Sequence, residues 1–316
     1  MSGSIIGIIV LLALTVLFGW LTLKGWGAQR AWVKWLSVLL AGLFTISFAL
    51  LTVVGVLGTY KLYRHNTVSM PEVTVAGTPD QIARGEHLAQ VLCASCHSLN
   101  GDLPLSGGKN LSEDAGLPLG DIYAPNLTPA TDIKEWTDSD LFRTIRTGVD
   151  DVGRATAMTA VVGTHALSDE DTLAIIAYLR QSPVVENETP EFKPTILMAL
   201  FAGAGLISMD VPAAVTVTSA PLKGATAAYG EYVLAYMDCT SCHGKNLDGV
   251  VPPPFPPAPD IRNYVSHWAK EDFFNVVHAF ALSSQSGDVM PWKDISRLDD
   301  VELEALYLYL HQVTSK

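Results

Sequence analysis

The chain of 316 residues is long enough for about two domains and a membrane anchor. Its net charge of −12 is unevenly distributed: residues 1–64 hold five basic and no acidic side chains, so residues 65–316 carry a net charge of −17. So acidic a surface excludes nucleic-acid binding. It serves solubility, and it favours a cationic partner, whose association rate it would raise.

Two uncharged apolar stretches, residues 4–23 and 35–60, predict a pair of membrane-spanning helices at the N-terminus. Each stretch is long enough, since a helix of about 20 apolar residues crosses a bilayer. A cleaved signal peptide is less favoured, because the first stretch has no basic leader, is too long and lacks an A-x-A-like cleavage site. The short connection holds Lys24, Arg30 and Lys34, and the positive-inside rule places it in the cytoplasm.

After a polar tether, a first helical segment begins near Thr78-Pro79, where a capping residue precedes a proline. This helix runs into Cys93-Ala94-Ser95-Cys96-His97, a C-x-x-C-H motif. Two more helices are expected over about residues 137–148 and 168–180, each opened by a hydroxyl or carboxylate capping residue. Met158 lies in the loop between them.

An apolar linker, residues 195–209, follows, and it is short for a membrane span. We expect it to pack either between the two helical segments or against the anchor at the membrane surface. The order of elements then repeats. A helix leads into a second C-x-x-C-H motif at residues 239–243, Trp268 opens a middle helix, Met290 follows, and a last helix covers about residues 298–311.

The spacing within the two segments is the same at several positions. Trp136 precedes Met158 by 22 residues, and Trp268 precedes Met290 by 22 residues. Such self-similarity indicates an internal duplication, in which each unit is built around its own motif.

Each C-x-x-C-H motif predicts a site for covalently bound haem c. Two thiols three positions apart each form a thioether with one vinyl group, and the following histidine becomes an axial ligand of the iron. A zinc ribbon is excluded, because its cysteine pairs lie about 15–20 residues apart, whereas Cys96 and Cys239 are 143 positions apart. All four cysteines lie in the motifs, so none remains for a disulfide. The two predicted haem groups are attached and ligated by Cys93, Cys96, His97, Cys239, Cys242 and His243.

The opposite axial ligands are predicted to be Met158 and Met290, because thioether sulfur is a soft donor that suits a haem iron. His165 lies close to Met158 in sequence and is a rival ligand for the first haem. An axial histidine usually donates its other ring N–H to an acceptor such as a backbone carbonyl. The proline-containing loops at residues 124–126 and 256–258 are candidates to supply one.

Both helical segments resemble class I cytochrome c domains, in which C-x-x-C-H comes early and methionine late. Within that class, residues 124–129, 136–138 and 146–149 resemble the cytochrome subunits of membrane-bound bacterial alcohol and gluconate dehydrogenases. Those subunits usually carry three haems and no N-terminal hairpin. Two membrane helices followed by two haem domains are also similar to the dihaem subunit of cbb-type oxidases.

The resemblance implies an all-α fold, a two-helix transmembrane hairpin followed by two tandem class I cytochrome c domains. In cytochromes c, haem is attached on the outer side of the membrane. We therefore expect a multi-pass protein of the bacterial inner membrane, with its haem domains on the periplasmic side. The expected units are a hairpin at residues 1–65, a first cytochrome c domain at 66–190, an apolar linker at 191–222 and a second cytochrome c domain at 223–316.

The leading hypothesis is an electron-transfer subunit without substrate chemistry of its own. It would relay single electrons from a quinol-oxidising complex or a dehydrogenase to a soluble carrier or a terminal oxidase. Its expected partners are the bilayer, other subunits of a membrane redox complex and an electron carrier. Two alternatives stay open: the dihaem subunit of a terminal oxidase, and a dihaem peroxidase-like enzyme with one open haem.

Overall fold

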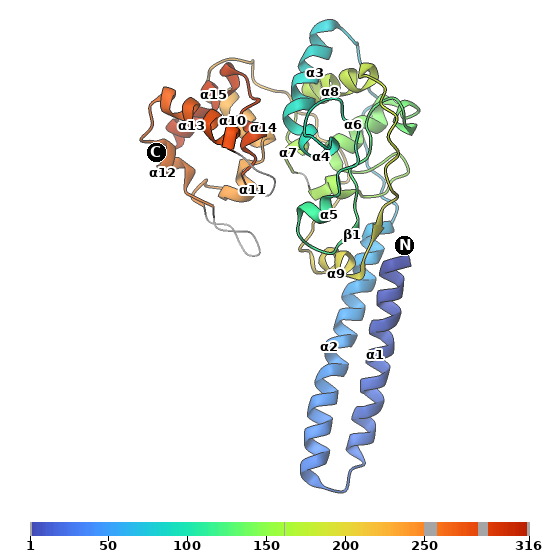
Figure 1. Cartoon of the computed structure of the whole chain (residues 1–316). Helices are drawn as coiled ribbons and strands as arrows, with labels where there is room; N and C mark the ends of the chain where they lie inside the picture. Colours follow the sequence, from blue (N-terminus) through green and yellow to red (C-terminus); the bar gives the residue numbers. More distant parts are fainter. Residues whose placement is uncertain (1, 161, 250–257, 284–289, 315–316) are drawn as a thin grey trace.

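The computed structural model describes residues 2–160, 162–249, 258–283 and 290–314. Figure 1 shows a long helical hairpin at one end of the molecule, a helical bundle on the open end of the hairpin, and a second bundle beside the first. We call residues 79–181 the first bundle and residues 227–314 the second bundle. The described residues are mostly helical, as expected, and their one regular sheet is an antiparallel pair of two-residue strands.

The elements follow in chain order. The first bundle and the segment after it contain α3 (Pro79–Leu92), α4 (Ala94–His97), α5 (Leu111–Asp114), β1 (Gly120–Asp121), η1 (Asp132–Lys134), α6 (Asp138–Thr147), η2 (Ala157–Ala160), α7 (Val162–His165), α8 (Asp169–Gln181), β2 (Lys193–Pro194) and α9 (Ile196–Ala204). The second bundle contains α10 (Ala227–Tyr236), α11 (Cys239–His243), α12 (Ile261–Val265), α13 (Lys270–Ser283), α14 (Trp292–Ile295) and α15 (Asp300–Thr314).

The hairpin consists of α1 (Ser2–Trp26) and α2 (Ala31–Tyr63), which are longer than the apolar stretches that predicted them. The ring of Phe18 packs against the rings of Phe44 and Phe48, with centroids 5.0 and 5.5 Å apart. In the most apolar part of α1 no residue is buried, and in that of α2 only 11% are. The helices therefore present apolar side chains outward, and both are long and apolar enough to cross a membrane.

Local capping explains where the helices of the first bundle begin. Thr78, Thr137 and Ser168 each accept a hydrogen bond from the backbone N–H three residues further on, at the starts of α3, α6 and α8. The end of α6 is set by Gly148, which has a φ of 71°, a left-handed conformation that glycine adopts without strain. These starts and this end confirm the helix boundaries predicted from the sequence.

In the second bundle two helices begin two residues later than predicted. The N–H of Trp268 bonds to the carbonyl of Val265 in the turn that follows α12, so α13 starts only at Lys270. Before α15, the Asp299 carboxylate accepts from the N–H of Glu302, and the Glu302 carboxylate accepts from the N–H of Asp299. Asp299 is thus the capping residue just before the helix, which begins at Asp300.

In each bundle two of the described helices cross closely at a glycine. A Cβ atom on Gly85 of α3 would lie 1.8 Å from the carbonyl oxygen of Ala174 in α8. A Cβ atom on Gly230 of α10 would lie 1.9 Å from the carbonyl oxygen of Ala305 in α15. Only glycine permits such an approach of two backbones, so the paired crossings are a structural counterpart of the sequence repeat.

We expect Gly230→Ala to destabilise the second bundle by about 1–3 kcal/mol, because the new methyl group forces α10 and α15 apart. The matched control is Gly224→Ala, whose Cβ would have no neighbour closer than 4.0 Å. Thermal unfolding should show a lower midpoint for Gly230→Ala and an unchanged one for Gly224→Ala. Equal midpoints would mean that the crossing does not constrain this position.

The linker helix α9 packs against the hairpin, which was one of the two places expected for it. A Cβ atom on Gly58 of α2 would lie 1.6 Å from the carbonyl oxygen of Ala199, so the two helices touch through their backbones. Just before α9, the carbonyl of Pro194 accepts a hydrogen bond from the hydroxyl of Ser4 in α1, 3.0 Å away. Helix α9 thus ties the first bundle to the open end of the hairpin.

Candidate functional site

The first C-x-x-C-H motif lies directly after α3 and forms the short helix α4. The ring of His97 is buried, and its Nδ1 lies 2.9 Å from the carbonyl oxygen of Pro125. Because a carbonyl only accepts, Nδ1 carries the proton and Nε2 keeps its lone pair free. Nε2 is therefore available as a metal ligand, and the contact confirms that the loop at residues 124–126 supplies the acceptor.

The loop that carries Pro125 is itself held in place. The side-chain amide of Asn126 is buried and donates to the carbonyls of Val185 and Asn187, at 2.8 and 3.1 Å. Its oxygen accepts from the N–H of Thr128 at 2.9 Å. These bonds leave the Pro125 carbonyl little freedom to move, so the orientation of the His97 ring is fixed through them.

The second motif repeats the arrangement of the first. It forms α11, and the buried His243 has its Nδ1 2.9 Å from the carbonyl oxygen of Pro259. The acceptor therefore comes one residue after the predicted loop, whose residues 256 and 257 lie outside the described part of the chain. In both motifs the imidazole has its Nδ1 bonded to a proline carbonyl and its Nε2 free.

All four cysteines are free thiols, and in each motif the two lie about one helical turn apart, on the same side of the chain. Burial is the main cause that raises the pKa of Cys93 and of Cys239 to about 12. Burial also raises the pKa of Cys96 and Cys242. The thiols are therefore neutral at physiological pH, unlike the thiolate of a redox-active C-x-x-C pair, whose pKa is lowered.

The ligands predicted to lie opposite the two histidines, called the distal ligands from here on, are in short turns rather than in long helices. Met158 is half-buried in η2, and Met290 is half-buried just before α14, where it packs on the core together with Trp292. His165 at the end of α7 bonds to the backbone of Met158. Its buried Nε2 has no hydrogen-bond partner, so His165 and Met158 both remain candidate ligands for the first site.

Two other methionines have packing roles that exclude them as ligands. Met198 and Met209 are almost fully buried in the apolar cluster between the hairpin, α9 and the first bundle.

The donor set therefore fits haem c at both motifs: two neutral thiols one turn apart, a buried imidazole with a free Nε2, and a sulfur or imidazole ligand further along the chain. Sequence reasoning missed the residues that join the two bundles next to these motifs. Arg84, Asp294 and Glu302 lie there, and no motif marked them, because their partners in the other bundle are remote in sequence. Only the Asp299–Glu302 spacing, which resembles a capping box, could have been noticed.

Comparison with known proteins identifies the family. The cytochrome c family model matches residues 82–183 and 227–314. The chain is 29% identical over 172 residues to the gluconate 2-dehydrogenase cytochrome c subunit of Pantoea cypripedii, a match that covers 51% of this chain and 37% of that subunit. It is 35% identical over 111 residues to the fructose dehydrogenase cytochrome subunit of Gluconobacter japonicus, covering 33% of this chain and 22% of the relative.

This chain thus spans well under half the length of either relative. The similarity confirms the resemblance to cytochrome c and to dehydrogenase cytochrome subunits that the motifs indicated. Membership of this family implies covalently bound haem c, which the donor set of both motifs fits. Since the two matched segments make up more than half of its residues and each contains one C-x-x-C-H motif, the chain belongs to the cytochrome c family.

Proposed function

We propose that this chain is a membrane-anchored cytochrome c with two covalently attached haem groups, and that it relays single electrons for a membrane-bound dehydrogenase. The observation that carries the proposal is the repeated site: two C-x-x-C-H motifs, each with a buried histidine whose Nδ1 is bonded to a proline carbonyl. The similarity to two dehydrogenase cytochrome subunits favours a dehydrogenase as the electron donor.

The residues of each bundle have distinct roles in this proposal. Cys93 and Cys96 attach one haem, and Cys239 and Cys242 attach the other. His97 and His243 would bind the two irons through Nε2, while the carbonyls of Pro125 and Pro259 hold the rings in one tautomer and orientation. Met290 would complete the second site, and Met158 or His165 the first. Haem c bound in this way supplies one-electron chemistry between Fe(II) and Fe(III).

With two protein ligands for each iron, neither site would offer a position to a substrate. The protein then contributes ligands, burial and docking surfaces, and the oxidation of a substrate belongs to another subunit. A soluble carrier or a terminal oxidase is the acceptor in this scheme. The acidic surface of residues 65–316 would attract a cationic carrier and raise its association rate.

We further propose that α1 and α2 span the bacterial inner membrane. Their outward apolar side chains support this, because few of them are buried against other parts of the protein. The basic turn with Lys24, Arg30 and Lys34 then lies in the cytoplasm. Both bundles lie beyond the opposite end of the hairpin, and they would stand on the periplasmic side, where haem c is attached.

The two matches to the family model and the two bundles support two tandem cytochrome c domains joined by the segment that contains α9. The bounds that we propose are residues 66–190 and 223–316, with the apolar linker between them. Each domain then carries one haem and one glycine crossing.

Haem content tests the proposal directly. We expect the purified full-length chain to contain two haem groups by the pyridine haemochrome assay, and two covalent haem increments by mass spectrometry. The double variants Cys93→Ser/Cys96→Ser and Cys239→Ser/Cys242→Ser should each lose one haem and keep the other, so each serves as the control for its counterpart. A single haem in the unmodified chain, or a variant that still binds two, would contradict the proposal.

A further inference from the structure

The two bundles contact each other at the first haem-binding motif and directly before the second. Helix α14, which follows Met290 in the second bundle, packs against α3 of the first bundle. The side chain of Asp294 in α14 bonds to the side chain of Ser95, which lies inside the first C-x-x-C-H motif. The segment beside the distal ligand of the second site therefore touches the attachment motif of the first site.

The first bundle contacts the second in a similar way, through the segment that follows its own distal ligand. Helix α7, which follows Met158 in the first bundle, packs against α10. A Cβ atom on Gly163 would lie 2.3 Å from the carbonyl oxygen of Tyr236 and 3.3 Å from the side chain of Asp238, the residue that precedes Cys239. The segment beside the distal ligand of the first site thus touches the chain that leads into the second motif, and the contacts are reciprocal.

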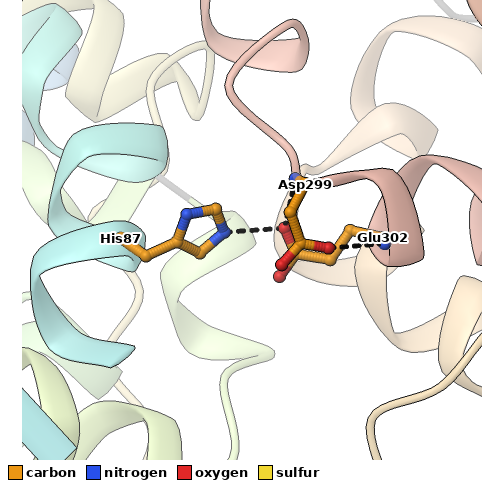
Figure 2. A group of neighbouring side chains, drawn as sticks. All are labelled: His87, Asp299 and Glu302. Carbon is orange, nitrogen blue, oxygen red and sulfur yellow. Dashed lines mark hydrogen bonds and ion pairs between the residues drawn. The ribbon is translucent and has the colours of Figure 1, made fainter. Parts of the chain in front are cut away.

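A buried ion-pair network also joins the two bundles. Glu302 at the start of α15 is 0% exposed, although it carries a carboxylate. One of its oxygens accepts from Arg84 of α3 at 2.7 Å. The other lies 2.7 Å from Nε2 of His87, also on α3 (Figure 2). Arg84 also forms a two-point bond with Asp171 of α8, at 2.9 and 2.8 Å. The network therefore connects α15 to two helices of the first bundle.

His87, Asp299 and Glu302 offer ligand atoms within 4.8 Å of one another, the spacing of a metal site. Their surroundings argue against a metal ion. Both oxygens of Glu302 already have partners, and the cationic groups of Arg84 and Lys223 lie 2.7 and 3.7 Å from one of them. A divalent cation would have to displace these positive charges, so the cluster is better explained as the link between the bundles.

We propose that Glu302 is a positioning residue that fixes the separation and orientation of the two haem-binding motifs. This inference rests on the proposed function, since it requires a haem in each bundle. Electron exchange between two centres slows steeply as their separation grows, so a fixed separation keeps the relay efficient. Glu302 acts through Arg84 and His87 and touches neither haem-binding motif.

A buried ion pair suits this role better than apolar packing does. Apolar contacts tolerate sliding, because they are non-directional. The forked guanidinium of Arg84, held by Asp171 on one side and by Glu302 on the other, accepts few arrangements of the two bundles. Since desolvating both charges offsets much of their attraction, what such a pair supplies here is a defined geometry.

The test compares Glu302→Gln with Glu304→Gln in the full-length haem-loaded chain. A glutamine at position 302 can still accept the hydrogen bond from the backbone N–H of Asp299 at the start of α15. It lacks the negative charge that pairs with Arg84. Glu304 lies on the same helix and pairs only on the surface of its own bundle, with Lys270 at 3.2 Å. Pulsed EPR on the oxidised protein measures the magnetic coupling between the two ferric haems, and a redox titration measures the two midpoint potentials.

We expect a broadened distribution of haem–haem distances and shifted midpoint potentials for Glu302→Gln, and unchanged values for Glu304→Gln. If Glu302→Gln yields no folded protein, Arg84→Lys is the substitute. It keeps the positive charge but lacks the forked guanidinium, so it should broaden the distribution of haem–haem distances less than Glu302→Gln would. Distances in Glu302→Gln or Arg84→Lys equal to those of the unmodified chain would overturn the inference. Haem content separates this failure from failure of the proposed function, which is refuted if the unmodified chain does not carry two haems.

Discussion

Replacing Met290 with alanine is expected to leave the second haem attached but to change its spin state and lower its reduction potential. Attachment depends on Cys239 and Cys242, which the change does not touch. The thioether of Met290 is a soft ligand that favours Fe(II), so its loss removes the stabilisation of the reduced form. The optical and EPR spectra report the spin state, and a redox titration reports the potential.

The control for this experiment is Met237→Ala. Met237 is half-buried, packs on the same core cluster and lies before the second motif, so its loss costs packing without removing a predicted ligand. Added cyanide should bind the second haem quickly in Met290→Ala and not in Met237→Ala. A low-spin second haem with an unchanged potential in Met290→Ala would remove Met290 from the set of ligands.

The parts of this fold that the sequence predicted are those that depend on neighbouring residues. Thr78, Thr137 and Ser168 cap helices through bonds to backbone groups three residues away, so the sequence around them contains the whole interaction. The same holds for the C-x-x-C-H motifs, whose chemistry requires only five consecutive residues. The hairpin was predictable because about 20 apolar residues suffice to form a span.

The interface between the bundles was not predictable in this way. Arg84 and Glu302 are 218 positions apart, and each alone resembles an ordinary charged residue on a helix. Whether such a residue is solvated or buried depends on which faces the folded bundles present to each other. The position of α9 was likewise left open, because its apolar composition suits the hairpin and a bundle interface equally well.

The glycine crossings could be predicted from the sequence only in part. Gly85 and Gly230 are each followed by a glutamate and lead into a motif, so their correspondence is visible in the sequence. Gly85 precedes Cys93 by eight positions, however, and Gly230 precedes Cys239 by nine. The second bundle accommodates one additional residue before its motif, and there Asp238 adopts a left-handed conformation with a φ of 54°. Aspartate is among the few residues other than glycine that tolerate this conformation.

Lowering the pH should weaken the link between the bundles. Burial alone would raise the pKa of Glu302, but hydrogen bonds and positive charge from His87 and Arg84 outweigh it and lower that pKa to about 2. Lys223 and Asp299 also face this carboxylate. A carboxyl group whose pKa is lower in the folded state than in the unfolded state stabilises the fold fully above its ordinary pKa. That contribution is lost as the pH falls towards the folded-state value.

For Glu302 the loss should occur between about pH 4.5 and pH 2, and it should amount to roughly 3 kcal/mol. We therefore expect the difference in thermal midpoint between the unmodified chain and Glu302→Gln to be large at pH 7 and smaller at pH 3. Other carboxyl groups titrate in the unmodified chain and in Glu302→Gln alike, so their contributions to stability largely cancel in the difference between the two midpoints. Glu304→Gln removes an exposed ion pair worth less than about 1 kcal/mol and should differ little from the unmodified chain at either pH. A difference for Glu302→Gln that stays constant from pH 7 to pH 3 would mean that the buried carboxylate does not hold the bundles together.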